Sequence, residues 1–154
     1  VNFAESFGVE IIPCIQTLGH LGRPLMWDPM IPLRDGPSTL LAGDEKVYEF
    51  IEEMLKFSRE CFKSTEIHIG MDESTEMGLG RYLGEHPYTD RVKLFCDHLT
   101  RVIGLCKKYD FVPMIWSDMF FRICCNGEYY QPDVKFNKEI IELKSCSRLF
   151  ISLI

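Results

Sequence analysis

The strongest constraint on the fold is an alternation of apolar runs and helical segments. Three apolar runs cover residues 9–16, 65–71 and 111–117, and apolar residues at three- and four-residue spacing predict helices over 44–61 and 89–109. This order predicts parallel strands joined by right-handed crossover helices, so the fold class is α/β with about three βα units.

The weaker parts of the pattern lead to further expectations. The first run contains Pro13, which has no N–H to donate to a strand ladder, yet its nearly continuous apolar character is typical of a strand covered on both faces. Gly8 is expected to close a helix over residues 1–7. The remaining predictions are long loops over 17–43, 74–88 and 118–135, a short helix over 136–143, and a tail over 148–154 that reads either as a strand or as a frayed end.

Composition and charge exclude several function classes. The chain has 154 residues, enough for one domain with a real core, and a net charge of -6 that argues against nucleic acid and anionic membranes as partners. It contains no run of 18 apolar residues, so we expect no membrane-spanning helix.

Cysteine usage indicates a reducing compartment. The seven cysteines are an odd number and form no CxxC pair. Most lie at apolar-periodic positions, so we interpret them as small buried side chains and expect a cytoplasmic or otherwise reducing intracellular location. They are Cys14, Cys61, Cys96, Cys106, Cys124, Cys125 and Cys146.

Loop lengths predict where a ligand binds. The long loops all follow strands, whereas the turns that lead into the second and third strands are short. In parallel α/β folds, ligand sites lie at the carboxyl ends of the strands. The candidates at that end are His20, Asp72, Glu73, Trp116 and Asp118. A Gly-rich phosphate-binding fingerprint follows none of the strands, which argues against a nucleotide site.

Two adjacent carboxylates end the second apolar run. Consecutive side chains at a strand end point in different directions, so Asp72 and Glu73 can perform two tasks on one ligand. Gly70 lets the backbone approach a neighbouring group closely. Elsewhere an Asp-Glu pair is usually a solvated turn or the start of a helix.

Three segments carry a resemblance to a known family. HIGMDE at 68–73 resembles the H-x-G-x-D-E signature of family 20 glycoside hydrolases, the β-N-acetylhexosaminidases. IPCIQTLGH at 12–20 and PMIWSDM at 113–119 are similar to the third- and fifth-strand segments of that family, in the same order and with similar spacing. The residues of these segments are most similar to the branch of the family that includes bacterial and hexosaminidase D-like members.

The resemblance implies an architecture. The family's catalytic domain is a (β/α)8 TIM barrel, and residues 1–154 would be an incomplete catalytic barrel containing approximately its third to fifth strands. The first-strand arginine and the later pocket residues of the family have no counterpart here, so we expect the isolated chain to be inactive.

The resemblance also implies a reaction. It is retaining hydrolysis of terminal β-linked N-acetylglucosamine or N-acetylgalactosamine, with a carbohydrate as partner and no cofactor. The nucleophile is the substrate's own acetamido oxygen, as in other substrate-assisted glycosidases. Glu73 would be the general acid and then the base, while Asp72 would accept the acetamido N–H and stabilise positive charge.

Three further residues receive roles in substrate binding, each beside a plainer interpretation. His20 would lie beside Glu73 and tune its affinity for the proton, or it is a loop histidine without a role. Trp116 would form a wall of the acetamido pocket, or it is a core tryptophan. Asp118 would contact sugar hydroxyls, or it caps the segment that follows. His68, inside a strand, is expected to be a core histidine with its hydrogen bonds satisfied.

Two other function classes stay open. A metal-dependent barrel hydrolase would use His20, His68 and Asp72 as ligands, because barrel metal sites take histidine and aspartate from strand ends. A non-catalytic partial barrel would expose sheet edges and apolar helix faces, which favours association with a partner or a second copy as a homo-oligomer.

Overall fold

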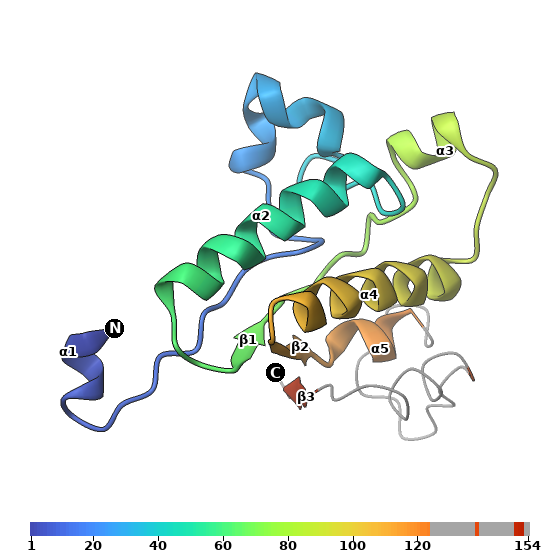
Figure 1. Ribbon diagram of the computed structural model, residues 1–154. Coiled ribbons are helices and arrows are strands. Elements are labelled where there is room, and N and C mark those ends of the chain that lie inside the picture. Colours follow the sequence, from blue (N-terminus) through green and yellow to red (C-terminus); the bar gives the residue numbers. More distant parts are fainter. Residues whose placement is uncertain (124–137, 139–149, 153–154) are drawn as a thin grey trace.

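Two long helices and a short parallel sheet form the centre of the molecule (Figure 1). The computed structural model describes residues 1–123, 138 and 150–152. Helix α4 packs on strand β2 and on helix α2. The described elements are α1 (Asn2–Glu5), η1 (Pro24–Met26), η2 (Asp28–Leu33), α2 (Glu45–Cys61), β1 (Glu66–His68), α3 (Arg81–Glu85), α4 (Arg91–Lys108), β2 (Val112–Trp116), α5 (Asp118–Arg122) and β3 (Phe150–Ser152).

The sheet has three strands in the order β1-β2-β3, and both strand pairs are parallel. Ile67 pairs with Pro113 in one ladder, and Met114 pairs with Phe150 in the other. A helix returns the chain from β1 to β2, as a parallel pair requires. The prediction of an α/β fold with parallel strands is confirmed, and the tail that could have been a strand forms β3.

The prediction of a covered strand over residues 9–16 holds only at the end of the segment, which pairs in parallel with β1. This segment forms only an isolated parallel bridge, between Cys14 and His68 of β1. Pro13 contributes as an acceptor, taking the His68 N–H at 2.9 Å, so its missing donor is no obstacle there. Residues 9–12, by contrast, are exposed, because nothing in the described chain covers them.

The two long helices confirm their predictions to within two residues. Each begins at an aspartate whose carboxylate accepts a backbone N–H of the first turn: Asp44 at 2.8 Å before α2 and Asp90 at 3.1 Å before α4. Such caps satisfy donors that lack a partner within the helix. The predicted helix over 1–7 is shorter, as α1, and is followed by Gly8 at φ +72°.

The core lies between the facing sides of α2, α4 and the sheet. Fully buried side chains recur at helical spacing, for example Ile51 and Leu55 on α2 and Phe95 and Leu99 on α4, around Ile67 of β1. Burying one such side chain contributes about 1.5–3 kcal/mol, so the helix stripes predicted from the sequence account for much of the cohesion.

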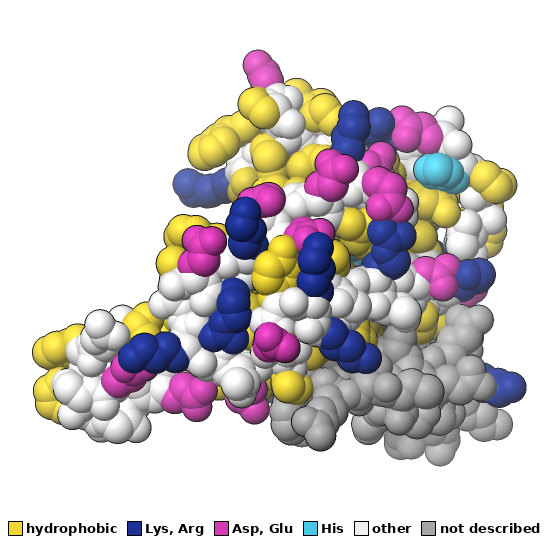
Figure 2. Space-filling view, viewed as in Figure 1, with side chains coloured by type: hydrophobic (Ala, Val, Ile, Leu, Met, Phe, Trp, Pro, Cys, Tyr) yellow, Lys and Arg dark blue, Asp and Glu magenta, His cyan; other side chains and the backbone are white. Residues whose placement is uncertain are grey.

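The outer sides of α2 and α4 are charged (Figure 2). Two ion pairs join the helices: Arg101 contacts Glu45 at 2.8 Å, and Lys108 contacts Glu52. Exposed ion pairs of this kind each contribute less than about 1 kcal/mol to stability, so the apolar stripes, rather than these pairs, determine how the helices pack.

The long loops contain more structure than the sequence predicted. The first holds η1 and η2, the second holds α3, and the segment expected to be a third loop begins as α5. Prolines at the starts of η1 and η2 supply a φ already suited to a helical turn. The predicted helix over 136–143, apart from residue 138, lies outside the described residues.

The cysteine prediction holds for two of the four cysteines that the structure describes, while Cys124, Cys125 and Cys146 lie outside the described residues. Cys96 and Cys106 are buried, and burial raises the pKa of the Cys106 thiol to about 12. Cys14 and Cys61 are exposed, contrary to prediction, because they lie on the open edge segment and at the end of α2. None of these four cysteines forms a disulfide with another described residue. Among the described helices, none is long and apolar enough to cross a membrane.

Candidate active site

Three chain segments meet at the carboxyl ends of the strands. The first brings Gln16 and His20, the second follows β1 and brings Asp72 and Glu73, and the third follows β2 and brings Asp118. The predicted site residues thus come from three separate loops, and their contacts with each other are direct.

The His20 imidazole faces both acids. Its Nε2 lies 2.9 Å from Oδ2 of Asp72 and 3.6 Å from Oε2 of Glu73. The Asp72 side chain is 16% exposed, whereas that of Glu73 is 58% exposed. His20 therefore lies beside Glu73 as expected and is nearer to Asp72. One acid is sheltered and fixed, while the other is open to an incoming ligand.

Gln16 is a site residue that the sequence reasoning missed. Its Nε2 donates to Oδ1 of Asp72 at 3.2 Å, and its Oε1 accepts the N–H of Met71 at 3.3 Å. The amide thus holds the acid and the backbone before it. A signal was present, since Gln16 is the polar residue that ends the first apolar run, but only the fold places it opposite Asp72.

The site's backbone lies largely in the left-handed region. The φ angles are +57° at His20, +71° at Met71 and +47° at Glu73. Residues other than glycine adopt this conformation rarely and at a cost, and it concentrates at functional sites. Gly70 has φ +67°, and an added Cβ there would lie 2.0 Å from Oε1 of Gln16. The turn after β1 therefore needs glycine for both conformation and space.

Asp118 holds the main chain of Glu73. Its Oδ2 accepts the Glu73 N–H at 2.9 Å and lies 3.4 Å from Nε of Arg122. The side chain is buried, and burial raises the pKa of the Asp118 carboxyl while the N–H groups of Glu73 and Met119 lower it. This geometry favours a positioning role, whereas the capping interpretation gains no support, because the N-cap of α5 is Ser117 and Asp118 is its first residue. Contact with sugar hydroxyls stays a prediction.

Trp116 and His68, on neighbouring strands, pack against each other. Their ring centroids are 4.5 Å apart at an interplanar angle of 47°. His68 is buried, and its Nδ1 accepts the N–H of Gly70 at 3.1 Å. Burial lowers the pKa of His68, with Asp72 opposing, which favours the neutral ring. The prediction of a core histidine is right for its burial, but Nε2 has no hydrogen-bond partner among the described residues.

The loop that contains Gly19 packs against the loop that carries Asp72 without room for a side chain at residue 19. A Cβ added at Gly19 would lie 2.7 Å from the Asp72 carbonyl oxygen and 2.6 Å from Oγ of Ser74. The Ser74 hydroxyl in turn donates to the Asp72 carbonyl at 3.2 Å. These contacts fix His20, the next residue after Gly19, against the two acids.

The metal-site hypothesis gains no support from the geometry. Within the described part of the chain, no three histidine, cysteine, aspartate or glutamate side chains gather closely enough to hold an ion. Nδ1 of His68 is occupied by the Gly70 N–H. His20, His68 and Asp72 are therefore not arranged as one ligand set.

Comparison with known proteins gives a consistent answer at the level of structure. No family model and no curated protein matches the chain. Solved structures do match, such as a β-N-acetylhexosaminidase with a TM-score of 0.66 at 16% identity, over 99% of this chain and 37% of that one. The β-N-acetylhexosaminidase of Bacteroides fragilis matches with a TM-score of 0.63 at 18% identity, over 98% of this chain and 29% of that one.

A third match has the same character. The pneumococcal exo-β-D-N-acetylglucosaminidase, whose tandem catalytic modules belong to glycoside hydrolase family 20, gives a TM-score of 0.57 at 20% identity, over 98% of this chain and 36% of that one. The chain thus spans about a third of the length of the structures it matches. At these identities the likeness concerns the fold, and the chain folds as part of the TIM barrel found in family 20 β-N-acetylhexosaminidases.

Proposed function

We propose that this chain carries the catalytic acids of a retaining exo-β-N-acetylhexosaminidase, which removes terminal β-linked N-acetylglucosamine or N-acetylgalactosamine. The observation that carries the proposal is the cluster of His20, Asp72 and Glu73, at distances of 2.9 Å and 3.6 Å, at the strand ends of this barrel fold. Ligands bind at that end in parallel barrels.

The first step breaks the glycosidic bond. The acetamido oxygen of the bound sugar attacks its own anomeric carbon, and Glu73 gives its proton to the departing oxygen. The exposed carboxyl of Glu73 suits this task, because the leaving group arrives from solvent. The products of the step are the free alcohol, an oxazolinium-like sugar and the Glu73 carboxylate.

The second step releases the sugar. Water attacks the anomeric carbon from the side that the alcohol left, Glu73 takes the water's proton, and the carbon–oxygen bond to the acetamide breaks. Two inversions at one carbon give net retention. Glu73 ends protonated, ready for another cycle.

Asp72 orients the acetamide. Its two oxygens are engaged by Gln16 and His20, but each carboxylate oxygen has two lone pairs, so the acetamido N–H can still be accepted. A carboxylate held from two sides keeps its place as positive charge develops on the sugar, and preorganised charge of this kind supplies much of the rate acceleration in many enzymes.

The remaining residues complete the binding site in this proposal. Trp116 supplies an apolar wall for the acetamide methyl group, His20 lies between the acids, and Asp118 fixes the backbone of Glu73. Two matched structures support a carbohydrate partner: the Streptomyces plicatus N-acetyl-β-hexosaminidase was solved with thio-NAglucal, and the pneumococcal enzyme was studied for N-glycan recognition and hydrolysis.

The test is a substrate panel on the complete protein that contains this sequence. We expect hydrolysis of nitrophenyl N-acetyl-β-glucosaminide, little hydrolysis of the matching β-glucoside, and a β-anomer as the first product seen by NMR. An α-anomer would contradict the retaining mechanism. Loss of activity in a chelator, restored by a divalent metal, would favour the metal-dependent alternative, and no hydrolysis of any panel member would favour the non-catalytic one.

A further inference from the structure

A fully buried histidine joins three parts of the fold outside the acid cluster. His98 lies on α4 and is 1% exposed. Its Nε2 lies 2.9 Å from the carbonyl oxygen of Thr17, and its Nδ1 lies 3.2 Å from the hydroxyl of Tyr48 on α2. Both ring nitrogens are therefore engaged, each by a different chain segment.

The donors in this network follow from chemistry. A carbonyl oxygen only accepts, so Nε2 of His98 must carry the proton that points at Thr17. Burial lowers the pKa of His98 to about 4, so the ring is neutral near pH 7 and Nδ1 accepts from the Tyr48 hydroxyl. The Tyr48 oxygen in turn accepts the N–H of Gly43 at 3.2 Å.

Thr17 is held from a second side. Its N–H and its Oγ1 both donate to the carbonyl oxygen of Ile69, at 3.2 Å and 2.8 Å. Ile69 directly follows β1 and precedes the turn that carries the acids. The Thr17 peptide therefore lies between α4 and the end of β1, and His98 provides the bond from the helix.

Only two residues separate Thr17 from His20. The carbonyl of Leu18 accepts the N–H of Leu40 at 2.9 Å, and Gly19 packs against the Asp72 carbonyl without room for a side chain. His20 itself has φ +57°. A short segment with so little freedom transmits a shift at Thr17 to the imidazole, and shifts of about 1 Å can cost about 100-fold in rate.

We propose that His98 is a positioning residue, which sets the place of His20 relative to Asp72 and Glu73 through its hydrogen bond to Thr17. Its effect on turnover rests on the proposed function, whereas its effect on the location of His20 does not.

Variants can separate this role from simple core packing. In His98→Gln the longer amide places an N–H near the position of Nε2 and keeps a donor for Thr17. In His98→Asn the shorter amide reaches only the position of Nδ1 and leaves the Thr17 carbonyl without its donor. Tyr48→Phe is the matched control, because it removes the other hydrogen bond of His98 and leaves the Thr17 bond in place.

The experiment measures three quantities on the complete protein: kcat and KM on nitrophenyl N-acetyl-β-glucosaminide, the melting temperature, and the NMR chemical shifts of the His20 imidazole. We expect all three variants to melt at lower temperature than the wild type. Only His98→Asn should move the His20 signals and lower kcat by about 10-fold or more, whereas His98→Gln and Tyr48→Phe should keep kcat within about 3-fold. If His98→Asn does not fold, His98→Met, which fills similar space without a donor, takes its place with the same expectation.

Two results would overturn the proposal. One is a His20 signal that stays in place when the Thr17 donor is removed. The other is a kcat that falls with melting temperature in all variants, whichever bond is lost. A wild type without turnover would refute the proposed function alone, since the His20 signals still report whether His98 positions that residue.

Discussion

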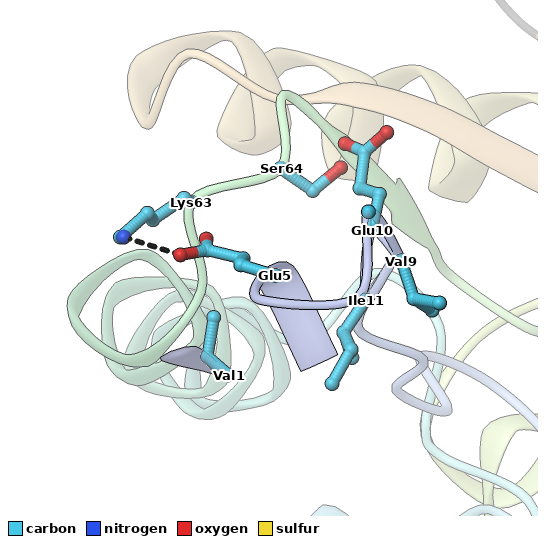
Figure 3. A pocket seen from close by; sticks show the side chains of 8 residues that line it. Val1, Glu5, Val9, Glu10, Ile11, Lys63 and Ser64 are labelled. Atoms are coloured by element: carbon cyan, nitrogen blue, oxygen red, sulfur yellow. Dashed lines mark hydrogen bonds and ion pairs between the residues drawn. The ribbon is translucent and has the colours of Figure 1, made fainter. Parts of the chain in front are cut away.

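The amino and carboxyl ends of the strands differ in how many polar side chains contact one another there. Near the start of β1, a cavity of about 350 Å³ is lined by residues of the first 11 positions together with Lys63 and Ser64 (Figure 3). Among its lining residues a charged contact joins Lys63 to Glu5 at 2.6 Å, with the Lys63 side chain 68% exposed and that of Glu5 35% exposed. Apolar Val9, which also lines this cavity, is exposed.

At the carboxyl ends the polar groups converge instead. His20 and Gln16 come from one chain segment and Asp118 from another, and each contacts the Asp72–Glu73 turn through a side chain. Strained backbone angles accompany these contacts. A site is therefore recognised by the convergence of fixed polar groups from several segments, whereas a pocket with a single ion pair offers no such set of groups to orient a ligand.

The largest effect is expected when one glutamate at each end of the strands is neutralised. In the complete protein, Glu73→Gln should lower kcat on nitrophenyl N-acetyl-β-glucosaminide by at least about 100-fold, because a general acid is lost. Glu5→Gln, at the opposite end, should leave kcat unchanged. Activity that survives in Glu73→Gln would remove Glu73 from the mechanism, and a loss in Glu5→Gln of similar size would show that the two ends do not differ.

The second prediction concerns the sheltered acid. Asp72→Asn should lower kcat by about 10–100-fold on substrates with an acetamide, because the group that orients the acetamide loses its charge. Any slow hydrolysis of the matching β-glucoside, which has no acetamide to orient, should change much less. Equal loss on both substrates would contradict a role for Asp72 in acetamide participation.

A stability measurement sharpens the contrast between a crowded turn and an open one. Gly70 and Gly43 both have positive φ, but a Cβ at Gly70 would meet Gln16 at 2.0 Å, whereas a Cβ at Gly43 would meet nothing within 4 Å. Gly43→Ala should cost about 1–2 kcal/mol of unfolding free energy from backbone strain alone. Gly70→Ala should lower the free energy of unfolding, measured by urea denaturation, by more than Gly43→Ala does. Equal losses would mean that the Gln16 side chain moves aside at no cost.

The smallest effect is expected at the amino end. Lys63→Gln removes the ion pair with Glu5, in which the lysine is mostly exposed and the glutamate is about one-third exposed. The unfolding free energy should fall by less than about 1 kcal/mol, and about 0.5 M salt should remove most of the difference. A larger loss that persists in salt would show that the amino end is more tightly organised than its contacts indicate.

Secondary structure was predictable where one face of an element is buried over many turns. The stripes of α2 and α4 identified both helices, since Ile51, Leu55, Phe95 and Leu99 recur at a helical period. The segment over 9–16 has equally apolar residues, yet residues 9–12 are exposed. A short apolar run cannot show which neighbour will cover it, so its partner decides whether it becomes a strand.

The site was predictable only in part, for a related reason. Asp72 and Glu73 are adjacent in sequence and stand in a motif, so they were identified together. Gln16 and Asp118 lie 56 and 45 residues from their partners in the site, and their hydrogen bonds exist only because parallel strands bring the loops together. For Asp118 the sequence left two roles open, contact with sugar hydroxyls or capping of the next segment, and the fold adds a third contact, with the Glu73 N–H.

Local periodicity and adjacency were enough to predict the order of elements, the end of the sheet that carries the long loops and the pair of acids there. Three features depend on packing between distant segments: the Asp72 oxygen that faces His20, the hydrogen bond from the Glu73 N–H to Asp118, and the contact of His98 with Thr17. The last two contacts join residues 45 and 81 positions apart, and distances between such residues depend on how helices and strands pack rather than on any local pattern.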